Sequence, residues 1–239
     1  MFDKDIFLFS LDDELSSLFS KNNLFNEVVE SLEKIDESVK IKHLPRKTWT
    51  DEMVKNKILL WQVPRTTAIF IYTLVRILKP NVVLEFGTSG GYSALWFAKA
   101  LEKNYLDLGN KFLNSSVYSG GIIHTIEFSD YRANIAETNF VKSGLDHIIK
   151  LYRGKIKSFI NPWNGPPIDF LFIDADKPHY LEHFMLVEDN LSSGSVVLAD
   201  NILDNPLKVK DFVDYMFSND CFFTTIFDFD NGLLFAIKK

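Results

Sequence analysis

The feature that most constrains the fold is a rhythm that begins after Pro80, where short apolar runs alternate with longer helical stretches. A run that is apolar throughout is typical of a strand buried on both faces of a sheet. Regular alternation of strands and helices predicts a parallel, doubly wound sheet. The predicted strands are Val82–Phe86, Ile122–Ile126, Ile148–Tyr152, Ile168–Ile173 and Ser195–Ala199, and the helices between them fall in Ser93–Leu101, Tyr131–Ser143 and Tyr180–Leu191.

The end of the chain departs from this rhythm. Phe222–Phe227 and Leu233–Ile237 are apolar runs separated only by Asp228–Gly232, which contains the turn-forming pair Asn231-Gly232. These runs predict an antiparallel hairpin. Together with the internal runs they give an α/β fold with a doubly wound seven-stranded sheet, mostly parallel, that ends in an antiparallel C-terminal hairpin strand.

The beginning of the chain lacks strand-like runs. Apolar residues between Leu24 and Ile35 recur at helical spacing, and a second, more apolar helix is predicted over Ala68–Leu78. Residues 1–60 are therefore predicted to be an N-terminal helical extension, serving as a dimer face or an element of a substrate pocket. Residues 61–239 are predicted to form the main domain.

One polar, irregular segment interrupts the pattern. Residues 102–121 are predicted to be an insertion between a helix and the second strand.

Composition excludes several protein classes. Aromatic residues make up 14% of the chain, which excludes a disordered protein, and the single cysteine, Cys221, excludes a disulfide framework or a zinc site built from several thiolates. The net charge of −6 argues against a broadly basic nucleic-acid surface. No apolar run reaches the ~18 residues of a membrane span, and the acidic N-terminal stretch lacks a signal-peptide pattern. We therefore predict a soluble, cytoplasmic protein without membrane contact.

A glycine-rich turn follows the first predicted strand and opens a helix. Its glycines allow a ligand to approach the backbone closely, and the helix N-terminus offers free N–H groups. The spacing matches neither the dinucleotide pattern GxGxxG nor a P-loop. Glu85, two residues before Gly87, suits a ligand with an amine or a hydroxyl and would repel a pyrophosphate. We interpret this turn as a ligand site, with a plain strand–helix turn as the alternative.

A second acid, Glu127, follows the second predicted strand. A carboxylate at this position can accept hydrogen bonds from both hydroxyls of a ribose, usually about 20 residues after the glycine turn. The separation from Gly87 is longer here, and the predicted insertion at 102–121 accounts for the excess. A solvated acid at the end of a strand is the alternative.

Two neighbouring strands end in acidic segments. Asp174 follows the strand Ile168–Ile173, and Asp200 and Asn201 follow the next strand. Because ligands of open parallel sheets bind at the carboxyl ends of strands, these side chains are expected to converge on the edge that carries the glycine turn. Three such oxygen ligands suit Mg²⁺, or Ca²⁺ or Mn²⁺. Lys177 follows closely, and a lysine beside a metal can lose proton affinity and act as a general base.

His179 and His183 form the pattern HxxEH, which occurs in a class of zinc proteases. A third ligand and a protease architecture are both missing from the sequence. We therefore favour a helix opened by Pro178, with a polar first turn and a half-buried His183.

Taken together, these segments resemble the cation-dependent class I S-adenosylmethionine O-methyltransferases, the group of catechol and caffeoyl-CoA O-methyltransferases. The resemblance runs from about Trp61 to the C-terminus and rests on VLEFGTSGGYSAL, TIE, FIDADKPHY, VLADNIL and NGLLFAIKK in the family's order. It implies a Rossmann-like class I methyltransferase domain over 61–239. It also implies S-adenosylmethionine as cofactor, a divalent cation (magnesium first, with calcium or manganese as alternatives) and a homodimer.

The resemblance also implies individual roles. Val63 would contact the cofactor through its backbone, Glu127 would bind its ribose, and Lys177 would be the catalytic base. The implied metal ligands are Asp174, Asp200 and Asn201, the implied substrate contact is Asn205, and the implied cofactor set is Val63, Glu85, Gly87, Thr88, Ser93, Glu127, Gly154, Lys155, Asp174 and Asp176.

The sequence leaves the identity of the methyl acceptor open. No carboxylate near Thr224–Thr225 clearly matches the acid that holds the second hydroxyl in the catechol branch, and Asp204 stands where plant members often have an aromatic residue. We expect a small acceptor with vicinal hydroxyls. The first alternative is an enzyme that methylates a hydroxyuridine of tRNA. The second alternative is a non-catalytic cofactor-binding protein on the same scaffold. The tRNA reading would use a basic strip of Lys150, Arg153, Lys155 and Lys157.

Overall fold

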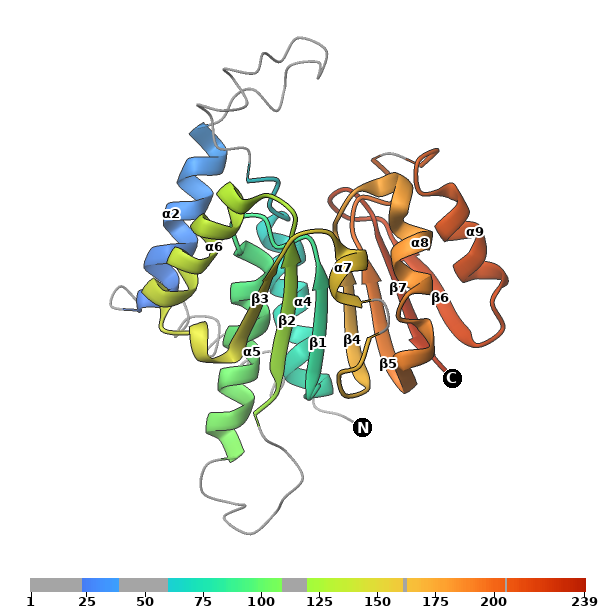
Figure 1. Cartoon of the computed structure of the whole chain (residues 1–239), viewed down its shortest axis with the longest axis horizontal. Helices are drawn as coiled ribbons and strands as arrows, with labels where there is room; N and C mark the ends of the chain where they lie inside the picture. Colours follow the sequence, from blue (N-terminus) through green and yellow to red (C-terminus); the bar gives the residue numbers. More distant parts are fainter. Residues whose placement is uncertain (1–22, 39–59, 109–119, 161–162, 205) are drawn as a thin grey trace, which may run out of the picture.

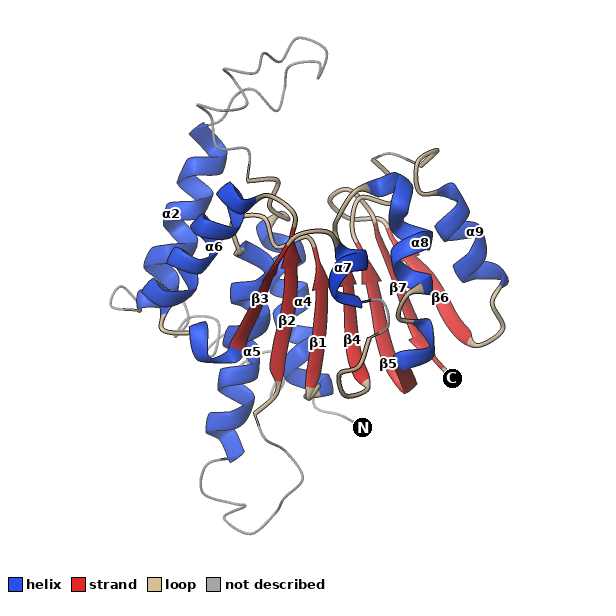
Figure 2. Cartoon of the chain, in the orientation of Figure 1, coloured by secondary structure: helices blue, strands red, loops and turns tan. Residues whose placement is uncertain are grey.

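The computed structural model describes residues 23–38, 60–108, 120–160, 163–204 and 206–239. Its centre is a seven-stranded sheet with the strand order β3-β2-β1-β4-β5-β7-β6 (Figures 1 and 2). β7 runs antiparallel to both of its neighbours, and all other pairs are parallel. The strands are β1 (Val82–Phe86), β2 (Ile122–Glu127), β3 (Ile149–Arg153), β4 (Ile168–Ile173), β5 (Leu191–Ala199), β6 (Phe222–Phe227) and β7 (Leu233–Lys238).

Helices cover both faces of the sheet, as the predicted doubly wound fold requires. In Figure 1, α7, α8 and α9 lie in front of the sheet, and α4 and α5 lie behind it. The helices are α2 (Leu24–Ser38), α4 (Arg65–Leu78), α5 (Tyr92–Leu108), α6 (Asp130–Ser143), α7 (Ile156–Ile160), α8 (Tyr180–Met185) and α9 (Lys210–Ser218).

Each face of the sheet has its own apolar core because successive side chains of a strand point to opposite faces. In β1, Val83 packs into the core beneath α2, α4, α5 and α6, whereas Leu84 and Phe86 pack into the core beneath α7, α8 and α9. All five residues of β1 are buried. This burial on both faces explains why the central strands are mostly apolar, with Glu85 as the buried polar exception in β1.

The predicted strands are confirmed, and those at Val82–Phe86, Ile168–Ile173 and Phe222–Phe227 have the predicted bounds. The C-terminal hairpin is also confirmed, with Asn231 and Gly232 in its turn. Apolar runs in the centre of a sheet leave little ambiguity, because each end of the run is marked by a polar or turn residue.

The predicted helix Tyr180–Leu191 is wrong in its second half. α8 ends at Met185, a short 3-10 helix spans Glu188–Asn190, and β5 begins at Leu191. β5 therefore starts four residues earlier than the apolar run Ser195–Ala199, and its register against β4 shifts between Ile168 and Phe170. The polar residues that lead into the run are exposed, so that the hydropathy pattern does not reveal this part of the strand.

The predicted insertion at 102–121 is wrong for its first part, because α5 continues to Leu108. Polar residues of this last stretch hold α5 against α4. The Asn104 amide donates to the Val75 carbonyl at 2.9 Å, and Arg76 forms an ion pair with Asp107 at 2.6 Å. Residues 109–119 lie outside the described residues.

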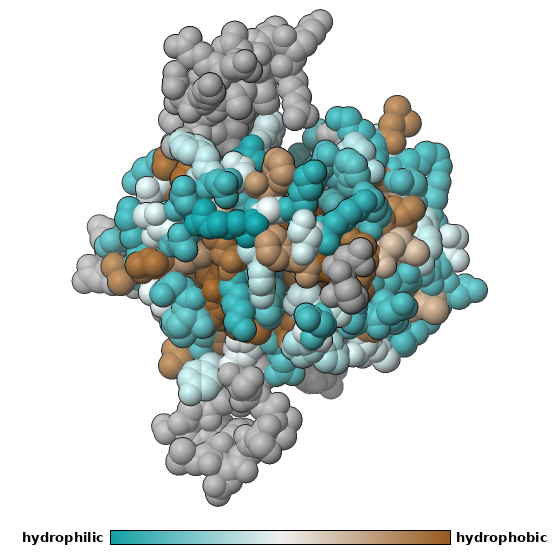
Figure 3. Space-filling view, viewed as in Figure 1, coloured by the Kyte–Doolittle hydropathy of each residue, from teal (hydrophilic) through white to brown (hydrophobic). Residues whose placement is uncertain are grey.

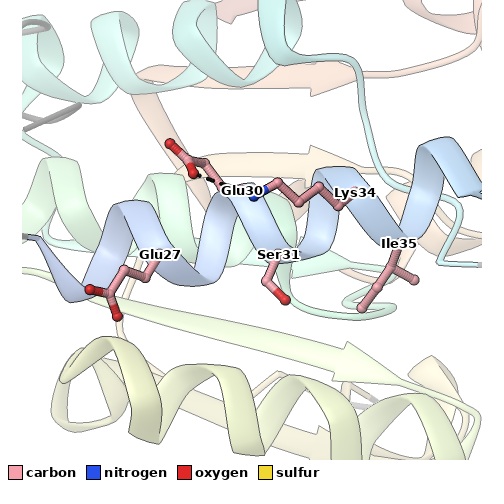
Figure 4. A pocket seen from close by; sticks show the side chains of 5 residues that line it. All are labelled: Glu27, Glu30, Ser31, Lys34 and Ile35. Carbon is pink, nitrogen blue, oxygen red and sulfur yellow. Dashed lines mark ion pairs between the residues drawn. The ribbon is translucent and has the colours of Figure 1, made fainter. Parts of the chain in front are cut away.

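The prediction of N-terminal helices is confirmed for α2. Its inner face, which includes Phe25, Val29 and Leu32, is buried against the sheet domain. Figure 4 shows its outer side, where Glu30 and Lys34 form an ion pair at 3.8 Å beside a shallow hollow. The rest of 1–60, apart from Asn23 and Leu60, lies outside the described residues.

Hydrophilic side chains cover most of the face in Figure 3, and smaller apolar areas show in its middle and at its edges. Among the helices that the structure describes, none is both long and apolar enough to cross a membrane.

Candidate functional site

A narrow cleft lies at the carboxyl edge of the sheet, the upper edge in Figure 2. One wall is the segment that precedes α4, and the other is the glycine turn with the start of α5. The cleft is lined by Trp61, Gln62, Val63, Gly87, Thr88, Ser89, Gly90, Tyr92, Ser93 and Asp174. Five of the ten implied cofactor residues therefore meet here: Val63, Gly87, Thr88, Ser93 and Asp174.

Gly87 allows the ends of β1 and β4 to approach closely. Its φ of +104° lies in a region that favours glycine, and a Cβ at this position would lie 2.1 Å from the Asp174 carbonyl oxygen. The Asp174 amide donates to the Phe86 carbonyl at 2.9 Å. The glycine turn and the first acid of the predicted metal segment are consequently fixed against each other by backbone.

Glu85 does not line the cleft but supports it from below. Its carboxylate is fully buried and accepts hydrogen bonds from the Ser93 and Thr125 hydroxyls, both at 2.5 Å. Burial, opposed by these two bonds, raises the pKa of Glu85 from 4.5 to about 7. A proton on Glu85 could be donated to the Ser93 oxygen, which would free the Ser93 hydroxyl to donate into the cleft.

Glu127 stands at the end of β2 with only 5% of its surface exposed. Its carboxylate accepts from the Ser89 amide at 2.7 Å and from the Ser129 amide at 2.8 Å. The Glu127 carbonyl accepts from the Gly154 amide at 2.8 Å, at a residue with a φ of +130°. The glycine turn, the ribose-binding candidate Glu127 and the cofactor candidate Gly154 are thus joined by direct hydrogen bonds.

Two buried polar atoms of the cleft have no hydrogen-bond partner among the residues that the structure describes. They are the amide oxygen of Gln62 and the hydroxyl of Ser89. An unpartnered buried polar atom costs free energy, which a polar ligand in the cleft would recover. Gln62 was missed by sequence reasoning because a glutamine outside any motif carries no signal of its own.

The acid cluster occupies the ends of β4 and β5. The Lys177 ammonium donates to the Asp174 carboxylate at 2.9 Å, and the Asp200 amide donates to the Ile173 carbonyl at 3.0 Å. Burial and the nearby Asp174 carboxylate raise the pKa of Asp200 from 3.8 to about 8. Of the three side chains predicted to converge, Asp174 and Asp200 therefore lie together, with Lys177 beside Asp174; the Asn201 side chain stays a prediction.

Asp200 also carries an unpartnered atom. Its side chain is 2% exposed, and its Oδ1 has no hydrogen-bond partner within the described part of the chain. The Tyr180 hydroxyl donates to the Asp200 backbone carbonyl at 3.1 Å and not to this oxygen.

Asn201 adopts a left-handed backbone conformation with a φ of +62°. The next two amides, of Ile202 and Leu203, donate to the carbonyls of Gly232 and Asn231 at 3.0 and 2.9 Å. The hairpin turn between β6 and β7 thus holds the loop that contains Asn201. The predicted substrate contact, Asn205, lies outside the described residues.

The same turn is tied to α4. The Thr67 hydroxyl, which is fully buried, donates to the Asp230 carboxylate at 2.7 Å. This pair links the start of α4 to the turn that holds the Asn201 loop. No local sequence signal indicates it, because the two residues come from distant parts of the chain.

The structure does not bring every predicted residue into the cleft. The Asp176 side chain is 72% exposed and lies 3.1 Å from Nδ1 of His179. Lys155 is exposed at the start of α7. Neither lines the cleft formed by the glycine turn.

The HxxEH pattern has the structure expected of a helix start. A 3-10 turn at Lys177–His179 with Pro178 near its beginning leads into α8. Burial lowers the pKa of His183 to about 4. Over the described ranges, no three His, Cys, Asp or Glu side chains form a metal-binding group; the predicted metal set has two carboxylates and one amide.

Two members of the basic strip are paired with acceptors. Arg153 contacts the Glu137 carboxylate at 2.8 Å and the Asn134 amide oxygen at 2.7 Å, and Lys157 forms an ion pair with Glu182. The strip therefore offers less free positive charge to a phosphate backbone than the sequence suggests.

Comparison with known proteins finds methyltransferases. A family model described as a methyltransferase domain matches residues 84–202, which include the glycine turn and both acidic segments. A catechol O-methyltransferase of Niastella koreensis is 30% identical over 138 residues, 56% of this chain and 55% of that protein. A caffeoyl-CoA O-methyltransferase of Medicago sativa is 25% identical over 153 residues, 61% of this chain and 56% of that protein. The chain thus spans about half the length of these curated relatives.

Solved structures share the fold over nearly the whole chain. An O-methyltransferase from Bacillus cereus in complex with SAH has a TM-score of 0.65 at 22% identity and covers 96% of this chain and 97% of its own. The O-methyltransferase TomG from Streptomyces achromogenes in complex with SAM has a TM-score of 0.67 at 21% identity and covers 96% of each chain. Residues 84–202 of the chain therefore match a methyltransferase domain, and the relatives of the chain include a catechol O-methyltransferase and a caffeoyl-CoA O-methyltransferase.

Proposed function

We propose that the protein transfers a methyl group from S-adenosylmethionine to an oxygen of a small acceptor with vicinal hydroxyls, with a divalent cation bound at the acid cluster. The observation that carries this proposal is the position of Asp174. It lines the cleft of the glycine turn and also belongs to the cluster with Asp200 and Lys177. A methyl donor in the cleft and an oxygen acceptor at the cluster would therefore be neighbours.

The cleft suits S-adenosylmethionine better than a nucleotide with a pyrophosphate. Glu85 and Glu127 bring carboxylates close to the cleft, where they favour a cationic or hydroxyl-bearing ligand. The unpartnered Gln62 oxygen can accept from the ammonium of the ligand, and the Ser89 hydroxyl can bond to a polar oxygen of it. When bound, S-adenosylmethionine supplies an electrophilic methyl group.

The acid cluster suits a divalent cation. Asp200 has a buried carboxylate oxygen without a partner, and its pKa of about 8 reflects burial beside a second carboxylate. We assign Asp174, Asp200 and Asn201 as the ligands, because hard oxygen donors with room for water are the set that Mg²⁺ prefers. When bound, the cation would stabilise negative charge on the acceptor oxygens.

Lys177 is the proposed general base. Its ammonium nitrogen lies 2.9 Å from Asp174 and 5.6 Å from the centre of the buried Tyr180 ring, so that it is held beside the cluster. In its neutral form, Nζ would take the proton from the acceptor hydroxyl, whose oxygen would gain the methyl group as the methyl–sulfur bond of the donor breaks and S-adenosylhomocysteine leaves. The chain's remaining contribution is positioning, because the sheet edge fixes donor and acceptor side by side.

Residues 61–239 form the proposed methyltransferase domain, and α2 packs against it. The proposal is tested by radiolabelled methyl transfer to a panel of vicinal-diol aromatics, first with Mg²⁺ and then with a chelator. We expect label to appear with Mg²⁺ and to vanish with the chelator. Transfer that persists in the chelator would contradict the metal role. Label that appears only on bulk tRNA, with a steep salt dependence, would replace the small acceptor.

A further inference from the structure

We propose that Glu33, on helix α2 outside the region that the methyltransferase family model matches, is a positioning residue of the cofactor cleft. The proposal rests on the proposed function, since it takes the ligand of the cleft to be S-adenosylmethionine. It assigns the N-terminal helix to the cofactor-binding unit, whereas the sequence suggested a dimer face or an acceptor-pocket element.

The Glu33 carboxylate holds one residue from each wall of the cleft. Its Oε1 accepts from the Tyr92 hydroxyl at 2.5 Å, and its Oε2 lies 3.0 Å from an Arg65 guanidinium nitrogen, which donates to it. Both carboxylate oxygens are thus engaged by groups that belong to other helices. The Glu33 side chain is 21% exposed and Tyr92 is buried, so that water competes weakly for the Tyr92 bond, whereas the Arg65 bond is exposed.

Tyr92 and Arg65 each lie at the start of a helix next to one wall of the cleft. Tyr92 is the first residue of α5 and itself lines the cleft, directly before the cofactor candidate Ser93. Arg65 is the first residue of α4 and directly follows the wall segment that contains Gln62 and Val63. A shift of either helix start would therefore change the width of the cleft.

The Tyr92 hydroxyl depends on this carboxylate. Tyr92 is 2% exposed, and burial together with the hydrogen bond to Glu33 raises its pKa far above the usual value. A buried hydroxyl that loses its acceptor is unsatisfied and tends to move towards another partner. Removal of the carboxylate would thus release Tyr92 towards the cleft.

The docking of α2 does not depend on Glu33 alone. Phe25 packs edge-on against Trp96 of α5 with ring centroids 5.3 Å apart, and Val29 and Leu32 are buried in the same core. Variants at Glu33 are consequently expected to keep α2 in place and the protein folded.

The same helix offers a matched control. Glu30 lies one turn before Glu33 but on the outer side of α2, where it pairs with Lys34 and where Figure 4 shows it pointing away from the helix below. Its substitution alters the charge of α2 by the same amount without touching the cleft.

The test is calorimetric titration of S-adenosylhomocysteine into the full-length protein and its variants, with thermal melts of each. We expect Glu33→Ala and Tyr92→Phe each to weaken binding about 5- to 20-fold, and Glu33→Gln, which keeps an acceptor for Tyr92, to recover part of the loss. The double variant Glu33→Ala/Tyr92→Phe should lose no more affinity than whichever single variant binds less tightly, because both substitutions remove the same contact. Glu30→Ala should bind like the wild type.

Unchanged affinity in Glu33→Ala and Tyr92→Phe would overturn the inference, even if both melted at lower temperature. A multiplicative loss in the double variant would also overturn it, because the two residues would then act separately. If Glu33→Ala fails to fold, Tyr92→Phe decides the question. Failure of the wild type to bind S-adenosylhomocysteine would instead contradict the proposed function and this inference with it.

Discussion

The two halves of the carboxyl edge differ in how completely their buried carboxylates are satisfied by hydrogen bonds. At the ends of β1 and β2, Glu85 and Glu127 each accept two hydrogen bonds from neighbouring groups of the chain. At the ends of β4 and β5, Asp200 is just as deeply buried, but one of its oxygens has no partner among the described residues. The first half is preorganised by the fold, whereas the second half needs a positive charge to complete it.

The difference follows from the chemistry of burial. A buried carboxylate is tolerated when hydrogen bonds replace its water or when it binds a proton or a cation. Glu85 has the hydrogen bonds as well as a pKa of about 7, whereas Asp200 lies close to a second carboxylate. The chain thus carries an unfavourable arrangement at Asp200, which a catalytic cation would relieve.

The largest effect on activity should come from substituting Asp200, the carboxylate at the end of β5 that has an oxygen without a partner in the described part of the chain. Asp200→Ala is expected to lower Mg²⁺-dependent methyl transfer about 10⁴-fold, because the cation loses a charged ligand. Affinity for S-adenosylhomocysteine should stay within about threefold of the wild type, since the first half is untouched. The exposed Asp214, paired with Lys210 on α9, provides the matched control Asp214→Ala. Unchanged turnover in Asp200→Ala would refute the metal assignment.

The next effect concerns Lys177. Lys177→Met keeps the length and apolar stem of the side chain but removes the proposed base, and it should lower the rate about 10³-fold. Single-turnover kinetics with saturating cofactor and Mg²⁺ would measure this step directly. Lys157→Met, at a lysine paired with Glu182, is the comparison variant and should react at the normal rate. A rate loss of similar size in both variants would argue for a general effect of charge.

The raised pKa of Glu85 should make the free energy of unfolding depend on pH. Its pKa is about 7 in the folded protein against 4.5 for an ordinary glutamate, so the folded state holds the proton more tightly. The bound proton contributes about 3 kcal/mol to the free energy of unfolding below pH 4.5. This contribution declines as the pH rises and is lost above pH 7.

Glu85→Gln has no proton to lose at this position. Urea unfolding at pH 5 and pH 8 should therefore show that the variant gains stability relative to the wild type at the higher pH. Equal differences at both pH values would show that Glu85 is ionised throughout and that the polar network alone supports it.

The smallest effect should arise from the link between α4 and the hairpin turn. Thr67→Val preserves the shape of the side chain but removes its hydrogen bond to Asp230, which should cost about 1 kcal/mol of stability. Because that turn holds the Asn201 loop, Mn²⁺ affinity measured by electron paramagnetic resonance should fall about twofold to fivefold. Thr66→Val, at the exposed neighbouring position, should change neither quantity. A normal Mn²⁺ affinity in Thr67→Val would show that the loop is held without this contact.

Much of this edge could be predicted from sequence because its groups sit at the ends of apolar runs. Asp174 and Asp200 follow β4 and β5, and the parallel order of these strands alone brings them together. The contacts that support the carboxyl edge of the sheet do not lie at the ends of apolar runs. Glu33 with Tyr92 and Thr67 with Asp230 join distant segments, and each residue is an ordinary helix or turn residue in its local sequence.

The errors in secondary structure have a similar origin. The end of α5 contains polar residues that read as a loop, yet Asn104 is buried because the Val75 carbonyl of α4 accepts its hydrogen bond. The three residues of β5 that follow the buried Leu191 are exposed and polar or glycine, yet the strand already begins at Leu191, which pairs with Ile168 of β4. In both places a tertiary partner determines the structure, and local hydropathy does not contain that partner.

The most direct test of the contrast between the two halves is the titration of S-adenosylhomocysteine into the wild-type protein, once in a chelator and once in saturating Mg²⁺. We expect one ligand per chain with dissociation constants that agree within about threefold, because the cofactor half is complete without the cation. Binding that is absent in the chelator and restored by Mg²⁺ would contradict the account, since the cofactor cleft would then depend on the acid cluster for its own structure.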